Sequence, residues 1–171
     1  MRWTDGRRAR IGIAATCVVA VGVVSLTVVA SSPGAGGPKC LGRKATIVGT
    51  DGNDVIYGTN GTDVIVAKGG RDQVFGLGGD DVICGNGGRD ILLGGSGDDN
   101  IVGGAGDDAL FAGSGDDNLF GGSGSDQLHG GSGEDYMVGD DVLPYRNDSC
   151  DGGDGTNDTA LGDCESKSNV P

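Results

Sequence analysis

The sequence predicts an all-β fold made from one short unit repeated in tandem. Ten nine-residue units tile residues 49–138 without a gap. In every unit the fourth residue is Gly, the sixth is Asp and the eighth is apolar. The first six residues of a unit are typical of turns, where Gly supplies backbone freedom, and the last three are typical of a strand. Because only the middle residue of such a strand faces one side, we expect the eighth residues to point inward as the core.

Composition alone suggests disorder as the alternative. The chain has 38 Gly but only 3 Phe, 3 Tyr and 1 Trp, and its net charge is −13. High charge with few aromatic residues is typical of disordered chains. Low-complexity chains carry no fixed register, however, whereas three positions match in all ten units. The repeat therefore favours an ordered, stacked structure.

An export segment is predicted before the repeats. Four arginines precede an uncharged run over 11–30 that ends in small residues, which is typical of a secretory signal peptide over residues 1–30. The run is also long enough to span a bilayer, so an uncleaved anchor remains an alternative. Both readings place the rest of the chain outside the cell. Residues 31–39 are expected to form a flexible linker and residues 40–48 an N-terminal cap.

The charge of the exported part limits its partners. Without residues 1–30 the chain keeps 8 basic and 24 acidic side chains. Nucleic acids and anionic membranes require a basic surface, so we expect neither as a partner. A strongly acidic chain attracts cations instead.

The nonapeptide resembles the G-G-x-G-x-D-x-U-x repeat of the repeats-in-toxin (RTX), or hemolysin-type calcium-binding, family. The resemblance covers all of residues 49–138. It implies a right-handed parallel β-roll in which two units make one coil, hence about five coils of about 18 residues with a cap at each end. Residues 139–171, where the repeat decays, are expected to form the C-terminal cap.

Calcium is the expected source of the missing folding energy. Each nine-residue unit buries one aliphatic side chain, which stabilises the fold by about 1.5–3 kcal/mol. Ordering the backbone costs about 1–2 kcal/mol for each of the nine residues, so burial alone does not offset it. Ca²⁺ takes six to eight oxygen ligands, which carboxylates and exposed Gly carbonyls can supply. By the resemblance, each ion lies between the turns of units n and n+2, giving up to about eight sites. The predicted metal ligands are the sixth residues: Asp54, Asp63, Asp72, Asp81, Asp90, Asp99, Asp108, Asp117, Asp126 and Asp135.

The turns are not equally suited to a cation. Units six to ten have Gly in second place, and we expect the best sites there, from Asp99 onward. Lys68, Arg71 and Arg89 put positive charge beside the earlier turns. Acidic fifth residues, such as Asp98 and Asp107, are expected to form a solvated rim rather than ligands.

Cysteines predict two disulfides. Cys17 would leave with the signal peptide, and an even number of cysteines in an exported chain is typical of disulfide pairing. Cys150–Cys164 is the natural pair within the C-terminal cap, and Cys40–Cys84 is then the remaining pair. Free reactive thiols are the alternative.

No catalytic constellation is found, so the protein is predicted not to be an enzyme. The single His, His129, is an outward ninth residue, and no Ser or Cys has a base nearby in the sequence. No small-molecule substrate is evident.

Two functions remain after catalysis is set aside. The first is a secreted calcium-binding protein that folds on binding Ca²⁺ and has a structural, adhesive or interaction role. The alternative is an accessory or remnant calcium-binding module of a secreted enzyme or toxin system. Outward ninth residues form an apolar ladder that would suit a protein partner or a second copy of the chain, although β-propensity alone also explains it. The ladder consists of Tyr57, Phe75, Leu93 and Phe111.

Overall fold

A computed structural model describes residues 37–139, 148–155, 157–162 and 164–168. The predicted signal peptide or anchor over 1–30, and most of the predicted linker over 31–39, lie outside the described residues. Within the described part of the chain, no helix could cross a membrane.

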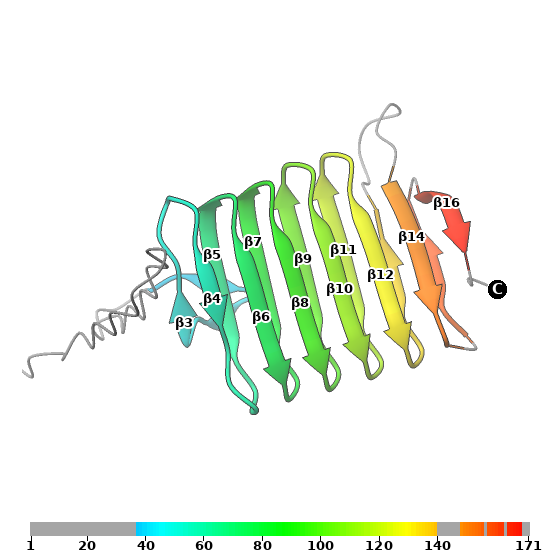
Figure 1. Cartoon of the computed structure of the whole chain (residues 1–171), viewed down its shortest axis with the longest axis horizontal. Helices are drawn as coiled ribbons and strands as arrows, with labels where there is room; N and C mark the ends of the chain where they lie inside the picture. Colours follow the sequence, from blue (N-terminus) through cyan, green and yellow to red (C-terminus); the bar gives the residue numbers. More distant parts are fainter. Residues whose placement is uncertain (1–36, 140–147, 156, 163, 169–171) are drawn as a thin grey trace, which may run out of the picture.

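Two parallel seven-stranded sheets face each other and form the body of the protein (Figure 1). The even-numbered sheet contains β4 (Val55–Tyr57), β6 (Gln73–Gly78), β8 (Ile91–Ser96), β10 (Ala109–Ser114), β12 (Gln127–Ser132), β14 (Asp148–Gly153) and β16 (Cys164–Ser168). The odd-numbered sheet contains β3 (Ile47–Val48), β5 (Val64–Gly70), β7 (Val82–Gly88), β9 (Asn100–Ala105), β11 (Asn118–Ser123), β13 (Tyr136–Val138) and β15 (Thr159–Leu161).

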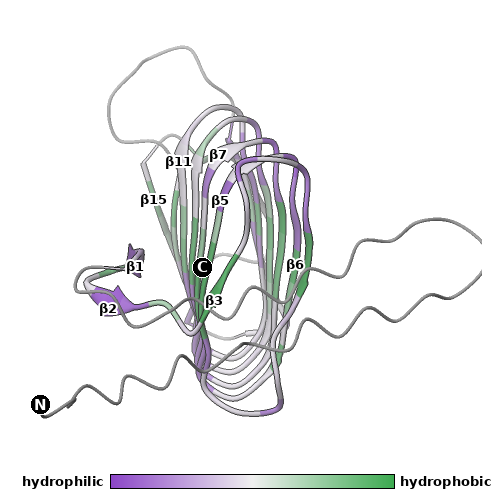
Figure 2. Ribbon diagram, turned by 90° about the vertical axis from the view of Figure 1, so that its left-hand side faces the viewer, coloured by the Kyte–Doolittle hydropathy of each residue, from purple (hydrophilic) through white to green (hydrophobic). Residues whose placement is uncertain are grey.

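The chain crosses to the other sheet with every unit and so forms a solenoid. In β8, β10 and β12, equivalent residues such as Leu92, Leu110 and Leu128 lie side by side in parallel register. Viewed along its axis, the roll is a flattened ring of superposed coils (Figure 2). The predicted parallel β-roll is confirmed, with about six coils rather than five, because β14 and β15 continue the stack into the C-terminal segment.

The strands are longer than the sequence pattern predicts. A typical strand runs from the seventh residue of one unit to the third of the next, as in β9, so most turns contain only three residues. The Gly residues that the pattern assigns to turns join the ladder, with Gly95, Gly113 and Gly131 in register. Equivalent residues above and below supply partners for the backbone N–H and C=O groups of these glycines, which outweighs the low strand propensity of Gly.

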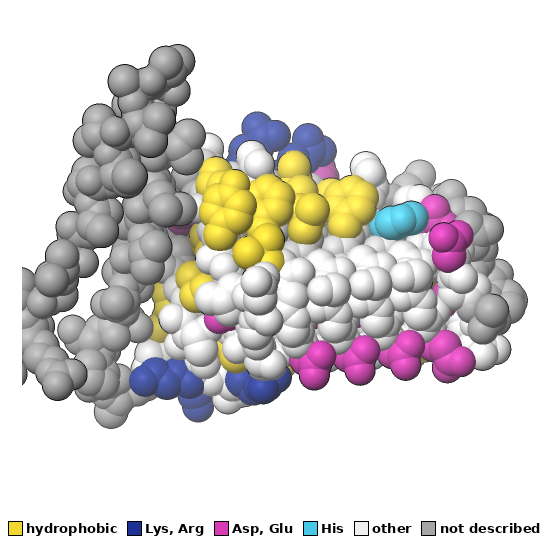
Figure 3. Space-filling view, turned by 60° about the horizontal axis from the view of Figure 1, so that its bottom comes forward, with side chains coloured by type: hydrophobic (Ala, Val, Ile, Leu, Met, Phe, Trp, Pro, Cys, Tyr) yellow, Lys and Arg dark blue, Asp and Glu magenta, His cyan; other side chains and the backbone are white. Residues whose placement is uncertain are grey.

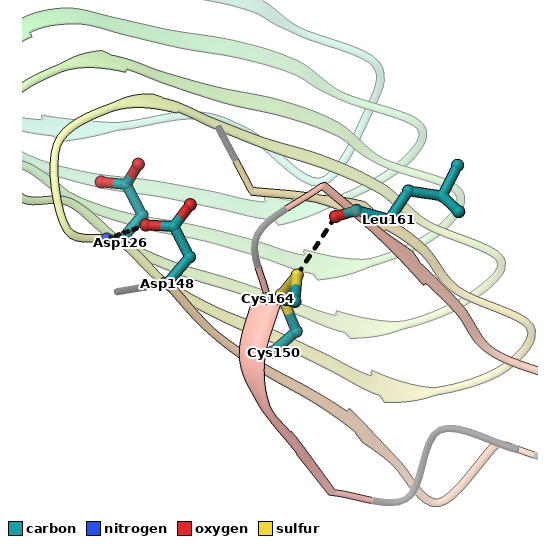
Figure 4. Close-up of a disulfide and its surroundings, with 5 residues drawn as sticks. All are labelled: Asp126, Asp148, Cys150, Leu161 and Cys164. Carbon is teal, nitrogen blue, oxygen red and sulfur yellow. Dashed lines mark hydrogen bonds between the residues drawn. A yellow bond between two sulfur atoms is a disulfide. The ribbon is translucent and has the colours of Figure 1, made fainter. Parts of the chain in front are cut away.

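The eighth residues form the core, as predicted. All are buried, and those from the second unit onward are at most 2 % exposed. Beyond the repeats, Cys150 and Ala160 continue the two rows. The Cys150–Cys164 disulfide therefore lies within the end of the core, where it takes the place of aliphatic side chains (Figure 4).

The N-terminal cap covers an outer face of the roll. Two short antiparallel strands, β1 (Lys39–Cys40) and β2 (Arg43–Lys44), form a hairpin outside the ring and beside the odd-numbered sheet (Figure 2). The hairpin segment packs on outward residues of β5 and β7, and the Cys40–Cys84 disulfide fixes it there. Both predicted disulfides are thus present. The apolar residues of this second cluster are Cys40, Ala45, Val48, Val64, Val66, Val82 and Cys84.

Candidate metal centres

The sixth-position aspartates stack into two columns, one along each edge of the roll. The strand alternation that turns the eighth residue inward also turns the sixth inward. From the third unit onward these side chains are 0–3 % exposed. One column contains Asp54, Asp72, Asp90, Asp108 and Asp126, and the other contains Asp63, Asp81, Asp99, Asp117 and Asp135.

Each column is held by a one-directional hydrogen-bond chain. The backbone N–H of every column aspartate donates to the Oδ1 atom of the aspartate one coil further on, at 2.8–3.0 Å. For example, the N–H of Asp90 donates to Oδ1 of Asp108 at 2.8 Å, and the N–H of Asp108 donates to Asp126. From Asp72 and Asp81 onward, this contact fixes one carboxylate oxygen of each side chain and leaves the other for a different partner.

The second oxygen, Oδ2, is buried and has no hydrogen-bond donor along most of both columns. Burying such an atom without a partner costs free energy, and it demands a positive charge or a donor. The side chains with this unsatisfied oxygen include Asp72, Asp81, Asp90, Asp99, Asp108, Asp117, Asp135 and Asp158.

The space beside Oδ2 is kept open by the first residue of the unit. A Cβ atom added to Gly85 would lie 2.5 Å from Oδ2 of Asp90 and 2.6 Å from the carbonyl oxygen of Gly103. A Cβ on Gly103 would meet Oδ2 of Asp108 and the carbonyl oxygen of Gly121, each at 2.6 Å. The glycines thus leave cradles lined by a carboxylate oxygen and a backbone carbonyl oxygen, which is the donor set that Ca²⁺ prefers. The residues present therefore fit this cation.

Burial makes the column carboxylates hard to ionise without a cation. It raises the pKa of Asp72 and Asp99 to about 6, and that of Asp108 and Asp117 to about 7. The backbone N–H donor opposes this rise in pKa, and the neighbouring carboxylates of the column add to it. The pKa values of Asp81, Asp90 and Asp135 are raised for the same first reason. A bound divalent cation reverses this preference because it favours the charged form.

The first two aspartates differ from the rest. Oδ2 of Asp54 accepts the backbone N–H and the hydroxyl of Thr50, at 2.6 and 2.9 Å. Oδ2 of Asp63 accepts the same two groups of Thr59, at 2.7 and 2.9 Å. All ten predicted residues therefore lie in the columns. In Asp54 and Asp63, however, protein groups already donate hydrogen bonds to Oδ2, the oxygen that has no donor along most of both columns.

Two further column residues, Asp148 and Asp158, are not among the ten that the repeat pattern predicts. Oδ1 of Asp148 accepts the N–H of Asp126 at 2.8 Å (Figure 4), and Oδ1 of Asp158 accepts the N–H of Asp135 at 3.0 Å. Their separations of 22 and 23 residues, in place of 18, break the nonapeptide register. The stretched motif at 152–158, Gly-Gly-Asp-Gly-Thr-Asn-Asp, was the available signal.

The fifth residues form the outer rim, and its two edges differ in charge. Beside the Asp81 column the rim is acidic, and each N–H donates to the carboxylate one coil earlier at 2.9–3.1 Å. A row of acidic side chains runs along one edge in Figure 3. The opposite rim includes Arg71 and Arg89, and Arg89 pairs with Asp107 at 3.2 Å. The acidic rim consists of Asp80, Asp98, Asp116 and Glu134.

Side chains alone do not complete a metal site. Among the described residues, no three His, Cys, Asp or Glu side chains converge as a ligand cluster. A cation in a column would therefore depend on backbone carbonyls for the rest of its oxygen shell, as Ca²⁺ commonly does.

Comparison with known families agrees with this geometry. The model for the RTX calcium-binding nonapeptide repeat, which spans four copies, matches residues 45–74, 57–92, 85–119, 93–128 and 111–141. No curated protein matches the chain. The family matches cover more than half of the chain, and they include the repeats that carry the columns. The chain belongs to the family of RTX calcium-binding nonapeptide repeat proteins, and its repeats form a calcium-binding β-roll.

Proposed function

We propose that the protein is exported and becomes a rigid, non-catalytic structural or adhesive element when its aspartate columns take up Ca²⁺ outside the cell. The observation that carries this proposal is the row of buried Oδ2 atoms without a protein donor, several of which, such as those of Asp90 and Asp108, lie beside a glycine cradle. RTX β-rolls are structural calcium-binding motifs and are generally non-catalytic, and RTX proteins are typically secreted. The basic and apolar segment at residues 1–30 supports export.

Column aspartates would hold the ions together with the carbonyls of the first-position glycines. The cation supplies positive charge to the carboxylates, which otherwise repel one another. We assign one site to each pair of successive aspartates in a column. This gives about four sites between Asp72 and Asp148 and about four between Asp81 and Asp158, about eight in all. We expect dissociation constants of about 10⁻⁴–10⁻³ M, in the range of extracellular modules. At ten times that concentration each site stabilises the roll by about 1.4 kcal/mol.

A calcium titration followed by circular dichroism tests the proposal. The full chain without residues 1–30 should gain β signal cooperatively in millimolar Ca²⁺, since binding and folding are one event. Equal Mg²⁺ is the control, because it demands an octahedral shell and dehydrates reluctantly. A chain that gains no β signal in millimolar Ca²⁺, or gains it equally with Mg²⁺, would contradict the proposal.

The alternative role, as an accessory module of a secreted enzyme or toxin system, rests on the apolar ladder. The ladder residues lie on the outer face of the even-numbered sheet, where Tyr57 is 51 % and Phe111 is 40 % exposed. Apolar side chains gather on this face in Figure 3. The rings of Tyr57 and Phe75 stack 4.8 Å apart, so neighbouring coils place their aromatic side chains against one another on this face.

Pull-down from culture medium with and without chelator separates the two roles. Calcium-dependent capture of one separate effector would favour the accessory role over the structural one. Changing Phe75→Ser and Phe111→Ser together should abolish that capture, or lower the mass measured by light scattering if two copies pair. No change in either readout would remove the ladder as an interface.

A further inference from the structure

The turns of the roll adopt two backbone conformations. From the third unit to the tenth, the second and fourth residues have φ between +71° and +151°. In the first two units neither Thr50 nor Thr59, nor the following Gly52 and Gly61, lies in that left-handed region. The first conformation is called the open turn below, and the second the closed turn.

The open turn is imposed against local preference in three units. Lys68, Leu77 and Asn86 stand in second place with φ of 85°, 83° and 71°. A left-handed backbone costs a residue with a Cβ atom about 1–2 kcal/mol. In the open turns of these units, Oδ2 of Asp72, Asp81 and Asp90 accepts no hydrogen bond and is left for a cation.

The closed turn supplies the donors that a cation would otherwise replace. The N–H and hydroxyl of each Thr bind Oδ2 of the aspartate four residues later at 2.6–2.9 Å. Each Thr hydroxyl also accepts the N–H of the glycine two residues on, at 3.2 Å. The two turns therefore close on themselves by hydrogen bonds between protein groups.

Other contacts around these turns are also independent of metal. The hydroxyl of Thr46 donates to the Asp63 carboxylate at 3.3 Å and accepts the N–H of Val64 at 2.9 Å. The Cys40–Cys84 disulfide and the apolar cluster under the hairpin hold the same region.

We propose that Thr50 and Thr59 take the place of the cation in the first two turns. They make the first coil a metal-independent platform on which the calcium-dependent coils stack, and they restrict Ca²⁺ binding to aspartates from Asp72 and Asp81 onward. The proposal rests on the proposed calcium function, because it assigns which turns use the ion. The residue in second place thus selects between two ways of satisfying the same carboxylate.

Hydrogen exchange of the exported chain with intact disulfides tests the proposal, read by mass spectrometry over segments. In chelator, we expect the amides of 46–66 to stay protected and those of 91–138 to exchange freely. In Ca²⁺ both segments should be protected. Failure of 91–138 to gain protection in Ca²⁺ would overturn the calcium function itself. If 91–138 gains protection in Ca²⁺ but the amides of 46–66 exchange freely in chelator, only the proposal of a metal-independent first coil would be overturned.

Matched variants assign the effect to the threonines. Changing Thr50→Gly and Thr59→Gly together should speed exchange of 46–66 in chelator on the order of tenfold or more, since each of the two carboxylates loses its hydroxyl donor. Calorimetry should then show additional Ca²⁺ bound per chain. Thr50→Ser with Thr59→Ser keeps the hydroxyls and should restore protection in chelator. Thr62→Gly, an exposed fifth residue, is the control and should change neither readout. Unchanged protection and unchanged stoichiometry in the Gly variant would overturn the role of the threonines.

Discussion

Asp107 and Asp108 are neighbours in one turn, yet they lie in opposite environments. The Asp108 side chain is 3 % exposed in its column, and burial raises its pKa to about 7. The Asp107 side chain is 51 % exposed at the rim, where it contacts Arg89. The same contrast holds for Asp98 beside Asp99 and Asp116 beside Asp117. The place of a carboxylate in the strand alternation, rather than its residue type, decides whether it is suited to hold a cation.

The largest expected effect is on the pH dependence of the metal-free roll. The column carboxyls bind protons in the fold up to about pH 6–7, as for Asp99 and Asp108, whereas an ordinary Asp releases its proton near 3.8. The folded state therefore binds more protons between these values, and stability falls as pH rises through this window. In chelator, β signal should be greatest near pH 4 and be lost by about pH 7.

In Ca²⁺ the dependence should reverse, because protons compete with the ion. Circular dichroism against pH, in chelator and in saturating Ca²⁺, measures both curves. Metal-free stability that is flat or rises with pH between 5 and 7 would show that the columns are not buried as described.

A matched pair of substitutions tests the inner column against the rim. Asp108→Asn keeps the Oδ1 acceptor for the N–H of Asp90 and removes the charge. It should disturb the two calcium sites on either side, toward Asp90 and toward Asp126. The free energy of unfolding should then fall by about 3 kcal/mol when free Ca²⁺ is ten times the dissociation constant. In chelator the same variant should be more stable than the parent, because a buried charge has gone.

Asp107→Asn is the control at the rim and should move the calcium midpoint less than about twofold. Calcium midpoints by circular dichroism compare the two variants. Equal shifts would mean that both rows of carboxylates hold the ion.

Glycine substitutions test whether the left-handed turn that separates a column aspartate from its rim neighbour requires glycine. Gly106 has φ +133°, and an added Cβ would overlap the backbone carbonyl of Gly88. Gly106→Ala should therefore lower the free energy of unfolding in Ca²⁺ by about 2 kcal/mol or more. Gly87→Ala, where the nearest atom is 3.9 Å away and φ is not left-handed, should stay within about 0.5 kcal/mol. Ala105 already occupies the equivalent place one coil on. Melting in saturating Ca²⁺ measures both variants, and similar losses would contradict this account.

The smallest expected effect is at the rim ion pair. Arg89 and Asp107 are 58 % and 51 % exposed, so solvent screens their attraction. Arg89→Gln should change the melting free energy by less than about 0.5 kcal/mol, and added salt should erase the difference. A larger or salt-independent loss would show that the rim contributes to stability as the columns do.

The repeat register explains how much of the fold was predictable. A period of nine residues with one apolar position fixes the core row, so Ile101, Leu110 and Leu119 were correctly placed inside. The same register placed the sixth residues in two columns. Family resemblance then supplied the coil and the cation, and the cysteine count supplied the disulfides.

The parts that were missed depend on contacts between coils. Gly joins the strands only because equivalent residues above and below pair with it, which no single unit reveals. Asp148 and Asp158 lie beyond insertions that break the register. The role of Thr50 could not be predicted, since its two hydrogen bonds to Asp54 depend on the closed conformation of the turn. The hairpin over the odd-numbered sheet is set by tertiary packing.

The one-directional hydrogen bonds give the roll a polarity of assembly. Every column amide is satisfied by a carboxylate of the following coil and never of the preceding one. Removing the last coil would leave column amides such as that of Asp126 without their carboxylate acceptor, whereas removing the first coil would leave amides such as that of Gln73 without their carbonyl acceptor. In the last coil, Asp148 and Asp158 accept the final hydrogen bonds of the two columns, and the Cys150–Cys164 disulfide holds that coil in place.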